Sequence, residues 1–187
     1  MKHGIYKLIF SLLMVFLLAG CGSSGYEGLW IGTFYGEEAS LYLSGVRGIF
    51  TISGYSDVGM VNMSGNTGTI RMYGDVANIS ISGNTLTLTE GPESITFTRS
   101  TGRAAPSQIN GTWEGPRGWT LIFVNDRVYV IDDDGDVDHG TFTFASNSGT
   151  FSTGVYSYTM AFTVSGNTLS GQMQTFWGSN ENLSFTR

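Results

Sequence analysis

The fold class is decided by the stretch Asn78-Ile79-Ser80-Ile81-Ser82-Gly83-Asn84-Thr85-Leu86-Thr87-Leu88-Thr89. Apolar and polar side chains alternate on both sides of its centre, a pattern that is typical of a half-buried β-strand. The central Gly83-Asn84 pair predicts a tight hairpin, because both residues tolerate the positive φ angles that such turns need. We therefore expect two antiparallel strands joined by a short turn.

The same pattern recurs along the chain beyond its first 25 residues, which is rich in Gly, Ser, Thr and Asn and shows no sustained helical periodicity. In the first half, eight strand-like runs cover residues 28–34, 39–44, 47–53, 58–63, 68–73, 77–82, 85–90 and 94–99. Because the connections are short, sequential strands should pair antiparallel as a meander. Eight such strands can close into a barrel without exposed edges. We predict an all-β fold made of small antiparallel up-and-down β-barrels.

An internal duplication divides this part of the chain into two repeats. Three motifs recur in the same order, at offsets of 83 to 88 residues: Gly28-Leu29-Trp30 as Gly111-Thr112-Trp113, Ser80-Ile81-Ser82-Gly83-Asn84-Thr85-Leu86 as Thr163-Val164-Ser165-Gly166-Asn167-Thr168-Leu169, and Phe97-Thr98-Arg99 as Phe185-Thr186-Arg187. We place the first repeat at 26–100, a polar linker at 101–107 and the second repeat at 108–187. The prediction is two tandem barrels, and the alternative is one sandwich or larger barrel built jointly by both repeats.

The Gly-x-Trp motif that opens each repeat and the Arg that ends it resemble those of the lipocalins and the wider calycin family. In that family a tryptophan of the first strand closes one end of the barrel, and an arginine near the end of the chain packs across it. The resemblance implies that Trp30 with Arg99, and Trp113 with Arg187, close the two barrels. A guanidinium over an indole ring is stabilised by about 0.5–2 kcal/mol.

Strand alternation assigns many large apolar side chains to the barrel interiors. In the first repeat these are Leu41, Leu43, Phe50, Ile52, Val61, Met63, Ile70, Ile79, Ile81, Leu86, Ile95 and Phe97, and in the second Leu121, Phe123, Phe142, Phe144, Phe151, Phe162, Val164, Leu169 and Phe185. Side chains of this size should fill an eight-stranded barrel, so we expect packed cores and no cofactor. A small hydrophobic guest fits better in the first repeat, whose inward residues are smaller.

The first 20 residues resemble a bacterial lipoprotein signal peptide. Lys2 and Lys7 make the start of the chain basic. The apolar run after them is shorter than the roughly 20 residues of a membrane-spanning helix. Residues 18–21, Leu-Ala-Gly-Cys, resemble the lipobox, so we expect cleavage before Cys21 and a diacylglycerol on its thiol. Residues 21–25 then serve as a short tether. An ordinary secretory leader is the alternative, but it leaves the single cysteine unexplained.

Removing the leader leaves an acidic protein. Both lysines are lost, so seven of the nine basic residues remain against fifteen acids, a net charge of −8. Such a surface is a poor match for nucleic acid and offers no basic patch for lipid head groups. The acyl chains on Cys21 would then provide the membrane attachment. Gly22 stands where an aspartate keeps some lipoproteins at the inner membrane, which favours the outer membrane.

Few side chains are candidates for chemistry. Asp138 and His139 could form a base with its orienting acid, but no nucleophile motif accompanies them, and we expect a solvent-exposed histidine on a hairpin. Asp132, Asp134 and Asp136 are only weak candidate calcium ligands, because their spacing does not match an EF-hand and a solvated hairpin explains them better. No pair of carboxylates is placed for glycoside cleavage. An enzyme is therefore disfavoured.

Trp119 and Trp177 are candidate contact residues, because neither has a counterpart in the first repeat and both lie in glycine-containing loops. A loop aromatic offers apolar contact area at low entropic cost, although such residues can instead cap a barrel mouth. We predict a lipid-anchored cell-envelope protein with a non-catalytic binding or structural role, whose partner is an envelope protein or a glycan. The alternative function is a carrier of a small hydrophobic ligand inside a barrel.

Overall fold

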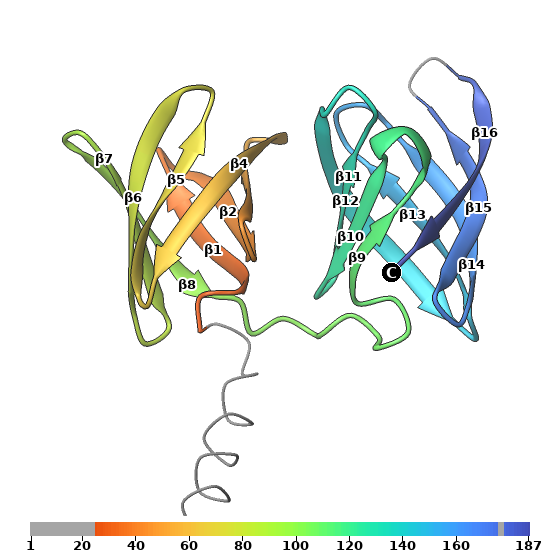
Figure 1. Ribbon diagram of the computed structural model, residues 1–187, viewed down its shortest axis with the longest axis horizontal. Coiled ribbons are helices and arrows are strands. Elements are labelled where there is room, and N and C mark those ends of the chain that lie inside the picture. Colours follow the sequence, from red (N-terminus) through yellow and green to blue (C-terminus); the bar gives the residue numbers. More distant parts are fainter. Residues whose placement is uncertain (1–24, 176–177) are drawn as a thin grey trace, which may run out of the picture.

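The computed structural model describes residues 25–175 and 178–187, which form antiparallel β-strands (Figure 1). The first eight strands are β1 (Gly28–Phe34), β2 (Glu37–Ser44), β3 (Arg47–Ile52), β4 (Tyr55–Ser64), β5 (Thr67–Met72), β6 (Asp75–Ser82), β7 (Thr85–Glu90) and β8 (Glu93–Arg99). Each agrees with a predicted run to within three residues at either end. The predicted signal peptide and Cys21 lie outside the described residues. Within the described ranges, no helix combines the length and the hydropathy needed to cross a bilayer.

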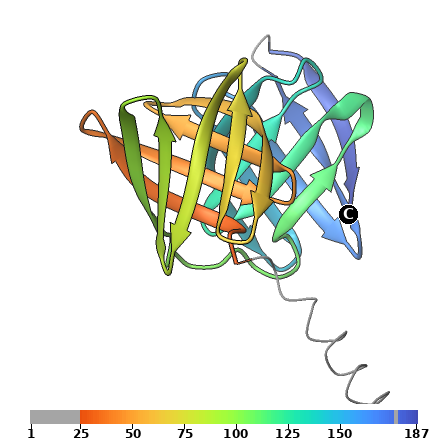
Figure 2. The same ribbon diagram turned by 60° about the vertical axis from the view of Figure 1, so that its left-hand side comes forward.

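Strands β1 to β8 form a closed antiparallel barrel, as the alternation and the short turns predict. Each strand pairs with the next one in the chain, and β8 returns to β1 through Trp30 opposite Arg99 and Gly32 opposite Phe97. The tilted strands are seen from the side in Figure 2. Because the ring is closed, neither β1 nor β8 presents a free edge to another chain.

The remaining strands form a second antiparallel unit. They are β9 (Gly111–Glu114), β10 (Thr120–Val124), β11 (Arg127–Ile131), β12 (Val137–Ala145), β13 (Ser148–Thr153), β14 (Thr159–Ser165), β15 (Thr168–Gln174) and β16 (Asn180–Thr186), with a single 3-10 turn, η1 (Pro116–Gly118), after β9. Consecutive strands pair, and β16 reaches β9 through one pair, Thr186 opposite Glu114. Ala105, which lies within the predicted linker, packs in the core of this unit.

Each unit has its own apolar core, drawn from the inward positions of its strands. The fully buried members of the first core include Trp30, Leu41, Ile70 and Phe97. Several predicted interior residues are only partly buried. They are Phe50, Ile52, Met63, Ile81 and Ile95 in the first unit and Phe142 and Phe144 in the second.

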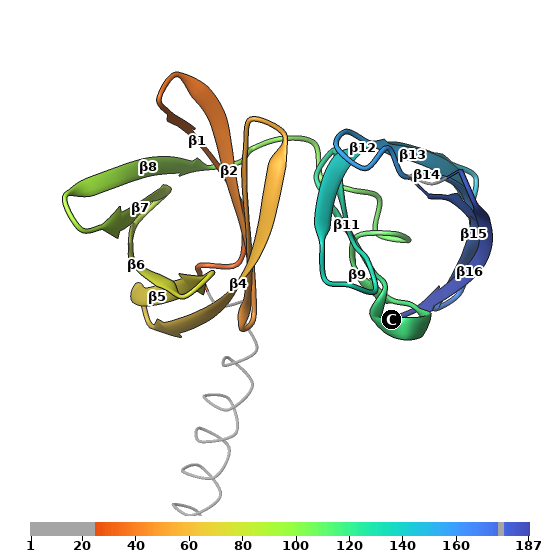
Figure 3. The ribbon, with the colours of Figure 1, turned by 90° about the horizontal axis from the view of Figure 1, so that it is seen from above.

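The two units pack against each other through a third apolar cluster. Leu29, Tyr42 and Ile49 on the outer face of the first unit meet Ile122 and Tyr129 on the outer face of the second. The rings of Tyr42 and Tyr129 stack with their centroids 5.9 Å apart. Seen from above, β2 and β4 face β11 and β12 (Figure 3). The two units therefore share a buried interface, which the sequence analysis did not anticipate.

Polar contacts surround this interface. Arg127 forms an ion pair with Glu38 and donates a hydrogen bond to the Ser40 hydroxyl at 3.3 Å. The same hydroxyl lies 3.5 Å from the hydroxyl of the buried Tyr129. One β-bridge, Val137 opposite Ser56, joins β12 to β4. The charged and hydroxyl groups at the boundary thus have partners, as burial of polar groups requires.

We predict that Ile49→Ala destabilises the protein by about 2–4 kcal/mol, because it opens a cavity between the units. Val46→Ala is the matched control, since Val46 is 74% exposed, and it should change stability by less than about 0.5 kcal/mol. Urea unfolding followed by tryptophan fluorescence measures both variants. Equal stability of the two variants would contradict a tightly packed interface.

Candidate functional site

The closed end of the first unit is built around Trp30, which is fully buried. Its indole Nε1 donates a hydrogen bond to the Tyr26 carbonyl at 3.0 Å. The Arg99 guanidinium lies 4.1 Å from the centroid of the Trp30 ring, donates to the Glu27 carbonyl at 2.7 Å and also donates to the Gly25 carbonyl. The last strand, the first strand and the segment before it are thus tied together at one point.

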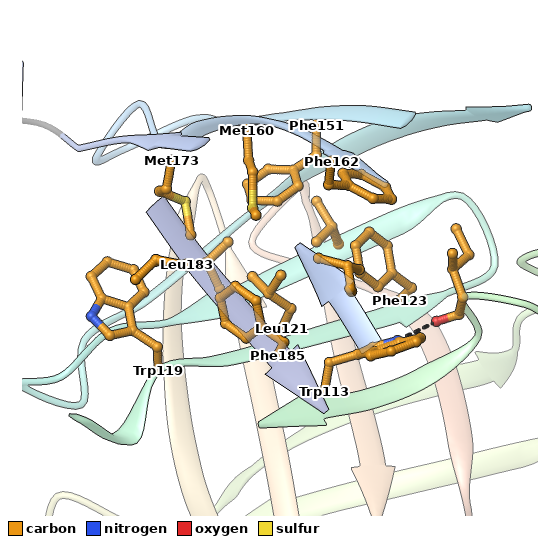
Figure 4. Close-up of a cluster of buried hydrophobic side chains, with 14 of the residues drawn as sticks. Trp113, Trp119, Leu121, Phe123, Phe151, Met160, Phe162, Met173, Leu183 and Phe185 are labelled. Atoms are coloured by element: carbon orange, nitrogen blue, oxygen red, sulfur yellow. Dashed lines mark hydrogen bonds between the residues drawn. The ribbon is translucent and has the colours of Figure 1, made fainter. Parts of the chain in front are cut away.

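The closed end of the second unit repeats this arrangement. Trp113 is fully buried and donates from Nε1 to the Ile109 carbonyl at 2.8 Å (Figure 4). The Arg187 guanidinium lies 4.6 Å from the ring centroid and donates to the Ser107 and Asn110 carbonyls, both at 3.3 Å. In both units the arginine is bonded to carbonyl oxygens rather than to a carboxylate. This geometry ties the end of each unit to its first strand and to the segment before that strand.

The recurring Ser-Gly-Asn-Thr turns dock at the same closed ends. The carbonyl of Asn66 accepts the N–H of Ile81, and that of Asn84 accepts the N–H of Arg99, both at 2.8 Å. In the second unit the Asn167 carbonyl accepts the N–H of Arg187 at 3.3 Å. The motif therefore does more than reverse the chain, because it also satisfies a backbone donor on the strand after next.

The opposite ends of the two units differ. In the second unit the connection between β9 and β10 folds back over the core, with the Gly115 N–H bonded to the Trp119 carbonyl at 2.7 Å. Trp119 lies with the buried apolar side chains of the second unit (Figure 4). It is only 3% exposed and packs edge-on against Tyr158, with ring centroids 5.4 Å apart. The prediction that Trp119 is a surface contact residue is therefore wrong. It caps the unit instead, and Trp177 lies outside the described residues.

Among the described residues no such cap covers the first unit, where Tyr35 and Gly36 alone connect β1 to β2. A pocket of about 140 Å³ opens there, lined mainly by apolar side chains of the core. Its walls include Phe34, Phe50 and Leu88. The sequence held a signal for this difference, since the first repeat has no counterpart of Trp119.

The acidic hairpin of the second unit is held by hydrogen bonds among its own groups. Asp132 Oδ1 accepts the N–H groups of Asp134 at 3.1 Å and Asp136 at 2.9 Å, and Oδ2 accepts the Tyr158 hydroxyl at 2.8 Å. Burial and this bond raise the pKa of Tyr158 well above its usual value. Within residues 25–175 and 178–187, no three acidic, histidine or cysteine side chains converge to hold a metal. Asp132, Asp134 and Asp136 therefore form a hydrogen-bonded turn, not the weak calcium site considered from the sequence.

His139 is half-buried between the units, so the expectation of an exposed histidine is wrong. Its Nδ1 lies 3.0 Å from the hydroxyl of Ser56 in the first unit. The neighbouring Asp138 is fully buried, but its carboxylate accepts the backbone N–H groups of His139, Val155 and Tyr156 rather than the imidazole N–H. The carboxylate thus does not orient the ring as a general base, and the contact joins the two units.

Comparison with known proteins gives no family. No family model matches the chain, and no curated protein matches it. Among solved structures, the DNA polymerase III beta subunit from Thermotoga maritima is similar over 89% of this chain and 57% of that chain, with 11% identity and a TM-score of 0.16. The chain thus spans just over half the length of that protein, and a likeness this weak carries no argument about fold or function.

We predict that Arg99→Gln destabilises the protein by about 1–3 kcal/mol, because it removes the cation–π contact and two charge-assisted hydrogen bonds. Arg71→Gln is the control, since Arg71 is exposed and lies on β5, which does not pair with β1. Urea unfolding compares the two variants. A loss that is no greater for Arg99→Gln would show that the closure does not depend on the guanidinium.

Burial lowers the pKa of His139, against the opposing influence of Asp138 and alongside that of Arg127. The folded state therefore favours the neutral ring, and its contribution to stability is complete above the ordinary histidine pKa of about 6.5. It is lost progressively as the pH falls below that value. We expect thermal unfolding midpoints of the wild type to fall more steeply between about pH 7.5 and pH 5 than those of His139→Gln. Parallel pH profiles would contradict this.

Proposed function

We propose that this chain is a lipid-anchored protein of the cell envelope with a non-catalytic binding or structural role, carried by two tandem lipocalin-like barrels. The observation that carries the proposal is the buried interface between the units, centred on Tyr129, which joins them into one body. A rigid pair of packed units is suited to holding a partner in a fixed position. Among the described residues, the chemically active side chains we considered serve structural contacts instead.

The second barrel of this proposal is supported by strand pairing and by the closed end. Strands β9 to β16 pair in sequence, and the pair Thr186 opposite Glu114 links the last strand to the first. The Trp113–Arg187 contact repeats that of the closed barrel. The lipocalin-like assignment rests on these two contacts and on the Gly-x-Trp motif.

The anchor is supported by the position of the first described residues. Arg99 holds the carbonyls of Gly25 and Glu27 at the closed end of the first unit. Cys21 precedes Gly25 by four residues, which can span at most about 14 Å. A lipid on Cys21 would keep this closed end near the membrane surface and leave the open end of the first unit facing away. The outer membrane, favoured by Gly22, is part of the proposal.

A second candidate function is favoured by one observation. The pocket of about 140 Å³ at the open end of the first unit could hold a small hydrophobic ligand, which would make the protein a carrier. Such a ligand would enter at this open end, because the core residues below it are fully buried.

Cell fractionation and native mass spectrometry of the wild type and Cys21→Ser test the proposal. We expect the wild type in the membrane fraction with the added mass of acyl chains, and Cys21→Ser in the soluble fraction. Ser24→Ala is the control and should behave as the wild type. A Cys21→Ser protein that stays with membranes would contradict the lipid anchor. A constant further mass that is lost on unfolding would favour the carrier.

A further inference from the structure

The open end of the first unit is an apolar pocket that the structure leaves uncovered. Phe34, Phe50, Met72 and Ile95 form the outermost layer of the first core and are only partly buried. In the second unit, Trp119 and Tyr158 pack edge-on against each other and belong to the buried core. A dry cavity of about 150 Å³ can hold one benzene ring, and the pocket here has about 140 Å³. Its size therefore fits a single ring or a short branched alkyl group.

Two carboxylates stand directly opposite each other at the rim of this pocket. Glu90 on β7 pairs with Glu93 on β8, and both side chains line the pocket. They continue the inward-facing rows of their strands, Leu86-Leu88-Glu90 and Glu93-Ile95-Phe97. Like charges at directly opposed positions of an antiparallel pair are destabilising. The sequence thus places a repulsive pair at the mouth of an apolar pocket.

The described residues supply no cation to relieve this repulsion. No arginine in the described ranges forms an ion pair with Glu90 or Glu93. The Tyr35 hydroxyl donates one hydrogen bond to Glu93 Oε1 at 2.9 Å, which leaves both charges in place. Two further acids, Glu37 and Asp75, lie opposite Phe34 and Met72 on the neighbouring hairpins. The field at the mouth is therefore negative, and a low-dielectric wall concentrates it.

From this combination we propose that the pocket binds a small organic cation. Its apolar part, about the size of one aromatic ring, lies against Phe34, Phe50 and Leu88, and its ammonium group lies between Glu90 and Glu93. An anion would be repelled at the rim, and a neutral compound would leave the two carboxylates unrelieved. The inference rests on the proposed binding role and narrows it to a ligand class. It concerns the first unit alone, because the second is capped.

The test uses the full exported chain carrying Cys21→Ser, so that no detergent competes for the pocket. Three probes share a benzyl group: benzylammonium, benzyl alcohol and phenylacetate. Titrations followed by NMR measure the affinity of each. We expect benzylammonium to bind about tenfold more tightly than benzyl alcohol, with an affinity that falls as salt is added, and phenylacetate to bind most weakly.

Glu90→Gln/Glu93→Gln is the decisive variant, because it keeps the shape of the rim and removes both charges. We expect it to bind benzylammonium about tenfold more weakly, to bind benzyl alcohol as before, and to unfold at a higher temperature without ligand because the repulsion is gone. The matched control is Asp126→Asn/Asp134→Asn, which removes two exposed charges from the second unit and should leave all three affinities unchanged. Ala77→Leu, which fills the pocket wall, should weaken both benzylammonium and benzyl alcohol.

The outcomes separate this inference from the proposed function. Equal affinities for benzylammonium and benzyl alcohol, unchanged by Glu90→Gln/Glu93→Gln, would overturn the cationic ligand while leaving a neutral carrier in place. Absence of binding by all three probes to a folded protein would overturn the pocket as a binding site. Neither result bears on the lipid anchor or on the inter-unit interface, which Cys21→Ser and Ile49→Ala test separately.

Discussion

A buried tryptophan under an arginine holds each unit together at its closed end. In the first unit, Trp30 belongs to the first strand and Arg99 to the last, and both donate hydrogen bonds to carbonyls of the segment before β1. A meander closes only if its first and last strands meet, and here that meeting is fixed by an indole and a guanidinium. Trp30 is fully buried and Arg99 is partly buried, so the cation–π contact is better shielded from water than one between two exposed side chains. Trp113 and Arg187 do the same in the second unit.

Close packing around these rings also explains two glycines. A Cβ atom on Gly32 would meet the Phe97 ring at 3.0 Å, and one on Gly115 would meet the Phe185 ring at 2.6 Å. Both glycines stand two residues after the buried tryptophan, and both phenylalanines stand two residues before the arginine. The closed end of each unit is therefore a repeated set of four positions, occupied by tryptophan, glycine, phenylalanine and arginine. A larger residue at either glycine would displace a core aromatic ring.

The two units share the same closed end but differ at the opposite end. In the second unit the connection after β9 is long enough to bring Trp119 over the core, and Tyr158 packs against it. In the first unit the turn of Tyr35 and Gly36 is too short to form a cap, so apolar side chains remain at the mouth and acids surround them. After a duplication, one copy can keep the packed end while the other retains an opening. A change in loop length is sufficient for this, because loops tolerate insertions better than strands do.

Much of this structure could be predicted from the sequence, because strand alternation and turn residues are local signals. The ranges and order of β1 to β8 follow from these patterns, whereas the contacts of Trp30 with Arg99 and of Trp113 with Arg187 were implied by the resemblance to the lipocalins. Contacts between residues remote in the chain carried no such signal. The burial of Trp119, the position of His139 between the units and the shared interface at Tyr129 depend on what lies opposite each side chain. The alternation of apolar and polar residues predicts which face of a strand a residue occupies. Whether that face contacts water, a second unit or a pocket is decided only by the packed structure.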